Sequence, residues 1–241
     1  MAIGESRIII LPETSALTLN LKPVLSSYHW TRAAGACFNY PAEGALIRAA
    51  ASTWPLGRFI VVSVIAMSQN PDLTIRRANR EDAGLLAELG ARTFAETFAT
   101  DNSPEDMAAY IAASFNLRQQ VAELADPAST FLIAEVGEVA AGYAKLHAGE
   151  PLEGVEGADP VELVRLYASR EWLGRGVGQA LMCACVDEAR QAGHRTLWLG
   201  VWERNGRAQA FYRKWNFRAV GEHVFQLGSD PQTDILMERA V

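Results

Sequence analysis

Three glycines separated by single residues interrupt the segment LYASREWLGRGVGQAL, residues 166–181. Gly174, Gly176 and Gly178 lack a Cβ atom, so this turn can adopt positive φ and bring its backbone N–H groups close to a ligand. The first N–H groups of the helix that follows have no partner inside the helix and lie at the positive end of its dipole. With the cation of Arg175 nearby, the arrangement is suited to holding a pyrophosphate.

A glycine-rich turn can also be an ordinary tight turn, so the residues that follow it matter. A dinucleotide-binding fingerprint would open a domain and precede an acidic residue by about 20 positions. Here the turn lies late in the chain and is followed by a strand, TLWLGV, and by the segment WERNGRAQAFYRKWNF. In that segment Asn205 is suited to cap a helix, and Tyr212 lies two turns further along the same helix face.

These residues resemble the GNAT superfamily of acyl-CoA N-acyltransferases. Its pattern is Arg/Gln-x-x-Gly-x-Gly/Ala after the fourth strand, then an Asn that opens the helix after the fifth strand, then a Tyr in that helix. The sequence supplies Gly176, Gly178, Asn205 and Tyr212 in this order, and the resemblance covers about residues 73–238. Leu173 stands where the family usually has Arg or Gln. This removes a side-chain contact but leaves the backbone cradle, so we expect coenzyme A binding to be retained.

A narrower likeness concerns one branch of the superfamily. The segments WLGVWERN, AFYRKWNF, RLYAS and VGEHVFQLGSDPQTDILM are similar to the PaiA-type branch, whose members are linked to acetylation of spermidine and spermine. The resemblance implies acetyl-CoA as cosubstrate and a small polyamine as acceptor. Alternative acceptors are a protein N-terminus or an aminoglycoside. The other alternative is an acyl-CoA-binding regulatory module without turnover, although the presence of Asn205 and Tyr212 favours an enzyme.

The resemblance also implies where the cosubstrate binds. Its pyrophosphate would lie on the glycine turn, and its pantetheine arm would run between the fourth and fifth strands, bonded by backbone groups of Leu166 and Ala168. Asn205 would bond the cosubstrate, or it would act only as a helix cap. The implied binding positions are Leu166, Tyr167, Ala168, Leu173, Gly174, Arg175, Gly176, Val177, Gly178 and Asn205.

The implied reaction is direct attack of a neutral amine on the thioester, which requires an acid and a base. The resemblance makes Tyr212 the general acid, and a phenol of pKa about 10 suits a weakly basic sulfur. An amine with a pKa of about 10.4 is mostly protonated at neutral pH, so a base is needed. Glu162 and Glu203 are the candidates, and the alternative for Glu203 is an ion pair with Arg204 or Arg207.

The aromatic residues Phe94 and Phe98 lie four positions apart on an expected helix. They are candidates for a wall of the amine site, and the alternative is a packed core face. His29, His147, His194 and His223 are scattered without metal-ligand spacing, so we expect no metal site and a structural role for His223.

The elements that position these residues alternate between strands and helices. Strands are predicted at residues 73–77, 130–136, 139–146, 161–168, 196–201, 217–223 and 234–238, and helices at residues 82–97, 104–113, 117–124, from 176 and at 205–214. Residues 137–138 suit a hairpin turn, and Asn79 with Asp82 suits a capping box. An antiparallel start followed by crossover helices predicts an α/β protein, a mixed twisted sheet flanked by helices, which is also the fold that the GNAT resemblance implies.

Residues 1–66 show no sustained helical or strand period, whereas a strand and helix pattern begins shortly after Met67. We therefore expect the transferase domain to span residues 67–241. Residues 1–66 are expected to be a miscalled upstream start or a disordered extension, and a targeting peptide is the alternative.

Charge and composition restrict the partners and the location. The chain has 28 acidic residues and 22 Lys and Arg; three of those acids and five of those bases lie in residues 1–66, so residues 67–241 carry a formal net charge of −8. Such a surface repels nucleic acid and attracts polycations. No apolar run approaches the roughly 20 residues that span a bilayer, and three cysteines form no disulfide framework. We expect a cytoplasmic enzyme without a membrane partner, and a homodimer because dimers are common in the superfamily.

Overall fold

The computed structural model describes residues 7–12, 41–42, 45–46, 48–54, 57–64 and 72–241, and the side chains of residues 72–241. The chain divides into two compact units, Met1–Pro71 and Asp72–Val241. In the first unit the strands β1 (Arg7–Pro12), β5 (Gly57–Val64) and β4 (Arg48–Trp54) form an antiparallel sheet, and β2 (Pro41–Ala42) pairs with β3 (Ala45–Leu46). The rest of the predicted extension lies outside the described residues, so the expectation for residues 1–66 stays a prediction.

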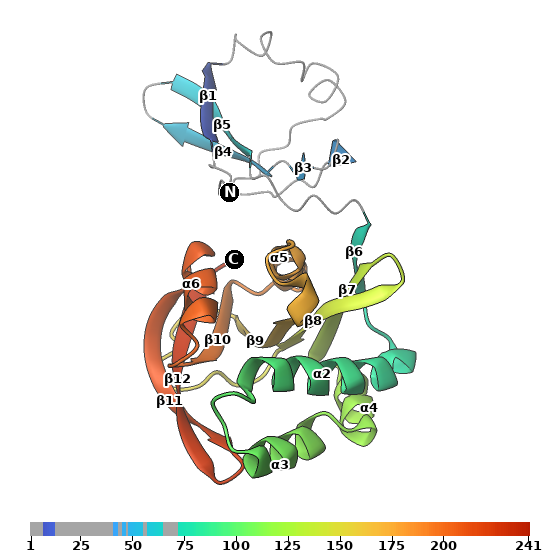
Figure 1. Ribbon diagram of the computed structural model, residues 1–241. Helices are drawn as coiled ribbons and strands as arrows, with labels where there is room; N and C mark the ends of the chain where they lie inside the picture. Colours follow the sequence, from blue (N-terminus) through green and yellow to red (C-terminus); the bar gives the residue numbers. More distant parts are fainter. Residues whose placement is uncertain (1–6, 13–40, 43–44, 47, 55–56, 65–71) are drawn as a thin grey trace. The chain divides into compact units, whose positions relative to one another are not determined.

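The second unit is built on a seven-stranded sheet with the order β11-β12-β10-β9-β8-β7-β6 (Figure 1). Its strands are β6 (Leu73–Arg77), β7 (Ser129–Val136), β8 (Val139–His147), β9 (Pro160–Ala168), β10 (Thr196–Trp202), β11 (Arg218–Leu227) and β12 (Asp230–Ala240). Neighbouring strands are antiparallel except β9 and β10, which are parallel. The predicted mixed sheet is confirmed.

Helices cover this sheet and connect its strands. They are α2 (Ala83–Phe98), α3 (Pro104–Ser114), α4 (Leu117–Ala125), α5 (Val177–Gln191) and α6 (Gly206–Lys214), with short 3-10 turns η1 (Arg80–Asp82) and η2 (Arg170–Trp172). The capping box of Asn79 and Asp82 forms at η1, directly before α2. No helix in the described part of the chain is both long and apolar enough to cross a bilayer.

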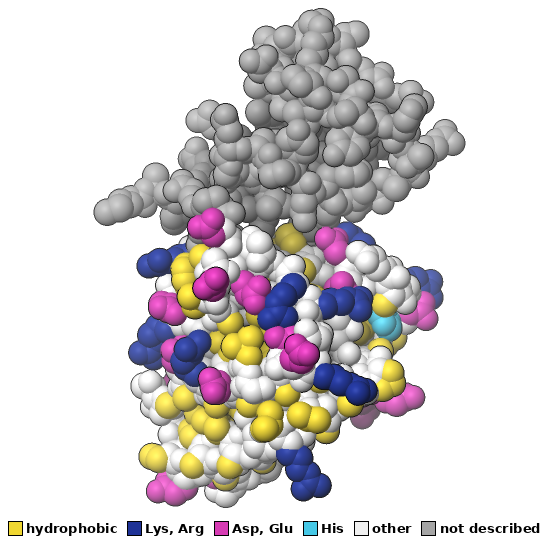
Figure 2. All heavy atoms as spheres, turned by 90° about the vertical axis from the view of Figure 1, so that its right-hand side faces the viewer, with side chains coloured by type: hydrophobic (Ala, Val, Ile, Leu, Met, Phe, Trp, Pro, Cys, Tyr) yellow, Lys and Arg dark blue, Asp and Glu magenta, His cyan; other side chains and the backbone are white. Residues whose placement is uncertain are grey.

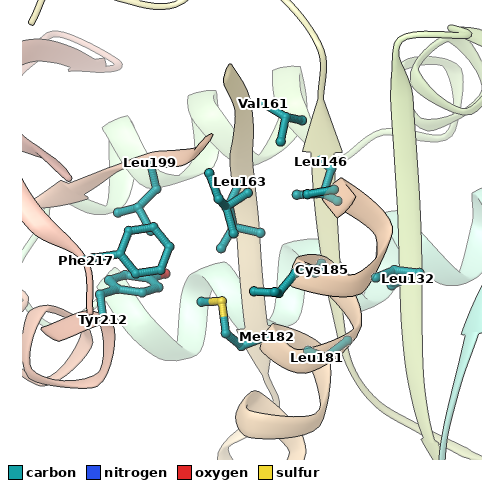
Figure 3. Packing of buried hydrophobic residues seen from close by; sticks show 14 of the residues in the cluster. Leu132, Leu146, Val161, Leu163, Leu181, Met182, Cys185, Leu199, Tyr212 and Phe217 are labelled. Carbon is teal, nitrogen blue, oxygen red and sulfur yellow. The ribbon is translucent and has the colours of Figure 1, made fainter. Parts of the chain in front are cut away.

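Alternation along the central strands separates two cores. On β7, Leu132 and Ala134 join a large cluster with α5, whereas Phe131 and Ile133 pack in a second cluster with residues of α2. Successive side chains of a strand point to opposite faces, so both faces of the sheet are covered. Figure 3 shows the first core, in which Leu181, Met182 and Cys185 of α5 pack towards the strands.

The C-terminal hairpin is longer than predicted, because β11 continues to Leu227 and β12 already begins at Asp230. Gly228 adopts a φ of 58° in the connecting turn, a conformation that glycine favours. The turn is held to α3, since the backbone N–H of Ser229 donates to Asp106 Oδ1 at 2.6 Å. The longer strands therefore carry residues that lie close to α2 and α3 on the face of the sheet that these helices cover.

Candidate active site

The parallel pair β9 and β10 is hydrogen-bonded only at its beginning. Pairs exist between residues 160–162 of β9 and residues 196–198 of β10, although both strands continue further. Beyond this point β9 still pairs with β8, and β10 still pairs with β12. The facing edges of the two strands therefore carry backbone groups without a strand partner, including the edge at Leu166 and Ala168. Such an edge can bind an extended ligand by main-chain hydrogen bonds.

A bulge distorts β9 next to this gap. Lys145 of β8 lies opposite Arg165, but its neighbour Leu146 lies opposite Leu163, so Val164 is the extra residue. Bulges bend a strand and change the direction of its neighbouring groups. Here the bulge lies where β9 and β10 diverge, which places a reoriented stretch of backbone at the opening between them.

The glycine turn leads directly into α5. Gly174 and Gly176 have φ values of 77° and 90°, and Gly176 is the N-cap without a side-chain cap. The first bond of the helix joins Ala180 N and Gly176 O at 2.9 Å. Within residues 72–241 the N–H groups of Val177 and Gly178 have no acceptor. This turn fits a pyrophosphate.

The space at Gly178 is open. A Cβ atom added there would stay 3.9 Å from its nearest neighbours, Leu166 and Phe211. Protein packing thus does not require glycine at this position. A ligand lying against the first turn of α5 would require it, and this supports the predicted cradle.

Leu173 and Arg175 flank Gly174 on the surface of the same turn. The Leu173 side chain is 40% exposed. The Arg175 guanidinium carbon lies 5.4 Å from the centre of the Trp172 ring, so it stacks on the 3-10 turn before the loop. The cation is held beside the cradle, whereas Leu173 adds no polar contact.

Asn205 caps α6, because its Oδ1 accepts a hydrogen bond from Ala208 N at 3.1 Å. This is the predicted capping role. The side-chain nitrogen has no acceptor among the described residues, so it is available to a ligand. The two roles predicted for Asn205 are therefore compatible.

Tyr212 lies on α6 in the core that faces α5. Its ring packs against Phe217, with 5.6 Å between the ring centres. Figure 3 shows it beside Leu163 and Leu199, which directly follow the last paired residues of β9 and β10. Burial raises the pKa of Tyr212 well above the usual value, so the phenol holds its proton at neutral pH. The raised pKa keeps the phenol protonated, as a donor requires, but makes it a weaker acid than the pKa of about 10 expected from the sequence. Its position suits a proton donor at the gap between the strands.

A cavity of about 170 Å³ opens on the opposite face of the sheet. Helix α2 contributes Phe94 and Phe98 to its wall, whose ring centres are 4.7 Å apart. The full lining is Phe94, Phe98, Tyr110, Glu162, Val164, Arg165, Tyr167, Trp198, Gly200, Trp202, His223, Phe225, Leu227, Gln232 and Asp234. It is a pocket with mostly aromatic walls that reaches the diverging ends of β9 and β10.

Two half-buried carboxylates lie in this cavity. Burial raises the pKa of Glu162, and the neighbouring His147, Lys145 and His223 only partly oppose that effect. Burial also raises the pKa of Asp234 to about 6, with His223 opposing the shift. Burial thus makes both carboxylates better proton acceptors than an exposed carboxylate.

Glu203, the other acid predicted as a base, lies on the surface after β10. Its backbone N–H donates to Thr233 O at 2.9 Å, and its side chain is exposed. It does not line the cavity described above, so the geometry favours Glu162 of the two candidates.

Sequence reasoning missed the contribution of the C-terminal hairpin. No motif points to Asp234, and the sequence predicts a structural role for His223, yet both line the cavity. A usable signal exists, because His223, Phe225 and Leu227 recur with a period of two, as do Gln232 and Asp234. That period places them on one sheet face, but it does not identify the face.

Arg165, which also lines the cavity, is already ion-paired with a carboxylate of α4. Arg165 forms a bidentate ion pair with Glu123 of α4, at 2.7 and 3.0 Å. Lys145 Nζ lies 3.1 Å from the same carboxylate. Desolvation alone would raise the pKa of Glu123, but the hydrogen bonds and the positive charge of Arg165 outweigh it, so the pKa is lowered. Arg165 is therefore already paired, and it leaves Glu162 and Asp234 without an ionic partner.

Comparison with known proteins agrees with this architecture. Residues 91–217 match the Acetyltransferase (GNAT) family. An uncharacterized N-acetyltransferase of Lactobacillus delbrueckii subsp. lactis is 36% identical over 169 residues, covering 69% of this chain and 96% of that protein. An uncharacterized N-acetyltransferase of Mycobacterium tuberculosis is 34% identical over 158 residues, covering 66% of this chain and 97% of that protein.

A solved structure shares the fold. The PaiA N-acetyltransferase of Thermoplasma acidophilum, in complex with coenzyme A, superposes with a TM-score of 0.58 at 21% identity, covering 70% of this chain and 99% of that one. The match to the family spans more than half of the sequence and includes the glycine turn, Asn205 and Tyr212. The chain belongs to the GNAT acetyltransferase family and is an N-acetyltransferase whose cosubstrate is acetyl-CoA.

Proposed function

We propose that the acceptor is a small polyamine that binds in the aromatic cavity with an ammonium group facing Glu162. The observation that carries this proposal is the lining of the cavity, which combines aromatic rings with two carboxylates that have no ion pair. Aromatic faces and carboxylates together are the groups that bind organic ammonium ions. A formal net charge of −6 over the chain further favours a cationic acceptor.

The cosubstrate is held by the chain in two places. We assign its pyrophosphate to the turn of Gly174, Arg175 and Gly176 and to the N–H groups of Val177 and Gly178. We assign its pantetheine arm to the free edge of β9 at Leu166 and Ala168. Acetyl-CoA supplies the activated thioester carbonyl, and binding at both places directs that group through the gap between β9 and β10.

Glu162 acts as the base in this proposal. It lies beside the opening, and its raised pKa brings it closer to the pKa of the amine from which it takes a proton. The neutral amine then forms the new C–N bond, and the C–S bond breaks. Tyr212, on the other side of the gap, donates its proton to the leaving sulfur. Bond formation leaves a second proton on the nitrogen; Glu162 passes the first proton to water beforehand, so its carboxylate accepts this second proton, and the Tyr212 phenolate regains its proton from solvent.

A panel of acceptors tests the proposed function. The full chain is incubated with acetyl-CoA and with spermidine, spermine, an aminoglycoside or a peptide, and release of free thiol is followed. We expect turnover on the polyamines, and a loss of at least tenfold in Tyr212→Phe, with Tyr143→Phe as a matched control that removes a buried phenol outside the cavity. Turnover only on the peptide or the aminoglycoside would replace the acceptor. Binding of acetyl-CoA without any turnover would indicate a regulatory module.

We also propose that the enzyme acts in the cytoplasm. Cys185 is a free and buried thiol, as expected for a thiol kept reduced. The homodimer inferred from the family resemblance stays a prediction, which the molar mass in solution tests.

A further inference from the structure

Glu162 and Asp234 differ from the other acids that are shielded from solvent. Within residues 72–241, every other non-exposed carboxylate accepts a hydrogen bond or forms an ion pair; Asp82 pairs with Arg76, and Glu238 pairs with Arg218. Glu162 and Asp234 have neither. Since removing a charge from water without a partner is costly, two charges in one cavity indicate a ligand that brings positive charge.

Asp234 lies in the middle of three strands. In register it faces His223 of β11 on one side and Trp202 of β10 on the other. Gly200 leaves room next to it, because an added Cβ would approach Asp234 Oδ2 to 3.2 Å and His223 Nε2 to 3.7 Å. Gly200 is the exposed residue of an otherwise buried strand, so the missing side chain keeps Asp234 open to the cavity.

Trp198 provides an independent sign of a ligand in the same cavity. Its side chain lines the cavity and the residue is only 3% exposed, yet its indole N–H has no acceptor. A buried donor without a partner is uncommon and needs an explanation. An ammonium group cannot accept this hydrogen bond, but the carbonyl oxygen of the acetyl group on a bound acceptor can.

We propose that Asp234 is a specificity-determining residue: it binds a second ammonium group of the acceptor, one that is not acetylated, while the reacting amine lies at Glu162. This rests on the proposed function. The reacting nitrogen must lose its positive charge before it attacks, whereas the second nitrogen keeps its charge and can stay paired with Asp234 throughout the reaction.

The sheet geometry sets the separation of the two positions. Strand β12 lies two strands away from β9, which separates Asp234 from Glu162 by about 10 Å across the sheet. Along the strand direction Asp234 lies four residues from the position opposite Glu162, about 13 Å. The two components together give roughly 16 Å between the two Cα atoms. Both side chains reach into one cavity, so the carboxylates are closer than that. An acceptor whose amines are separated by several methylene groups can engage both, whereas a monoamine cannot.

The charge of Asp234 depends on the groups around it. These are His223 of β11, Glu162, Arg165 and Tyr167 of β9, and Tyr110 of α3; the cavity residues of α2 and β10 are not titratable. Arg165 is paired with Glu123, and Tyr110 and Tyr167 are neutral because burial raises the pKa of each. Affinity for the second ammonium is therefore expected to rise as the pH passes through about 6.

A matched pair of acceptors tests the inference. Kinetics of the full chain are measured with 1,5-diaminopentane and with 1-aminopentane, which differ by one ammonium group. Asp234→Asn is expected to raise KM for the diamine at least tenfold and KM for the monoamine less than twofold, with kcat retained. Glu222→Gln, which removes an exposed acid of β11, is the control and is expected to change neither.

The structural variant Gly200→Ala keeps the carboxylate but narrows the space beside it. It is expected to raise KM for the diamine more than KM for the monoamine. An equal effect of Asp234→Asn on both amines, or no effect, would overturn the inference. Failure of the wild type to acetylate any amine would overturn the proposed function instead. In that case calorimetric binding of 1,5-diaminopentane still decides on Asp234, because the inference requires weaker binding in Asp234→Asn.

Discussion

At the scale of single residues, burial gives similar carboxylates different roles in this protein. Asp82 accepts hydrogen bonds from Arg76, which lower its pKa, so it stays charged and structural. Glu162 lies in an aromatic cavity without such a partner, and desolvation raises its pKa. The environment therefore selects Glu162 as a group that can take up a proton.

Replacing Glu162 by Gln removes the proposed base but keeps the size of the side chain. We predict that kcat/KM for a polyamine falls by about 10²–10⁴, the usual contribution of general acid–base catalysis. The wild-type rate is expected to fall as the pH is lowered and Glu162 becomes protonated, and this acid limb is absent in Glu162→Gln. Glu203→Gln, an exposed acid after β10, is the control; a similar loss in both variants would argue against a specific base.

Asp234 also affects stability, in a direction that follows from its pKa. The pKa of Asp234 is about 6 in the folded protein, whereas its ordinary value, which applies to the unfolded chain, is 3.8. The free energy of unfolding therefore falls as the pH rises from about 4 to 6, because the carboxylate must then ionise inside the cavity. We predict that Asp234→Asn raises Tm by about 2–4 °C at pH 8, the shift for roughly 1 kcal/mol in a domain of this size. The difference should vanish near pH 4, and an equal gain at both pH values would contradict the pKa shift.

At the scale of the elements, the start of α5 separates folding from ligand binding. Gly176 is a glycine for reasons of backbone conformation, since its φ is 90°, whereas nothing in the packing demands Gly178. We predict that Gly176→Ala lowers Tm. Gly178→Ala is expected to leave Tm within about 2 °C and to raise KM for acetyl-CoA at least tenfold. If the KM for acetyl-CoA were unchanged in Gly178→Ala, the pyrophosphate would not bind at the start of α5.

The start of α6 allows a similar separation at Asn205. Asn205→Ala removes the helix cap and is predicted to cost about 1 kcal/mol in the free energy of unfolding, measured by urea denaturation. Asn205→Asp keeps an oxygen for the cap but loses the side-chain N–H donor. We expect it to retain stability and to raise KM for acetyl-CoA. If the KM for acetyl-CoA were unchanged in Asn205→Asp, Asn205 would only cap the helix and would not bind the cosubstrate.

Local patterns made these elements predictable from the sequence. The glycines of the turn, the capping box at Asn79 and the cap at Asn205 depend on residues within a few positions of one another, and the structure contains all of them. The cavity could not be predicted in the same way. Asp234 joins Glu162 only because β12 inserts between β10 and β11, a long-range arrangement that no local period encodes.

At the scale of the whole molecule, charge is arranged differently inside and outside. Figure 2 shows acidic and basic side chains interspersed on one face of the second unit. The cavity contains two carboxylates and one arginine, and that arginine is already paired with Glu123. The net negative charge of the chain helps to attract a polyamine, but the unpaired carboxylates of the cavity select it.

Acetylation of a polyamine with Glu162 as base is tested by the mass of the acceptor after reaction. Spermidine is incubated with acetyl-CoA and either the wild-type chain or Glu162→Gln, and the products are analysed by mass spectrometry beside a measurement of acetyl-CoA binding. We predict acetylated spermidine with the wild type, and at least a hundredfold slower formation with Glu162→Gln although acetyl-CoA still binds. Equal rates in both proteins, or bound acetyl-CoA without any acetylated spermidine from the wild type, would contradict this prediction.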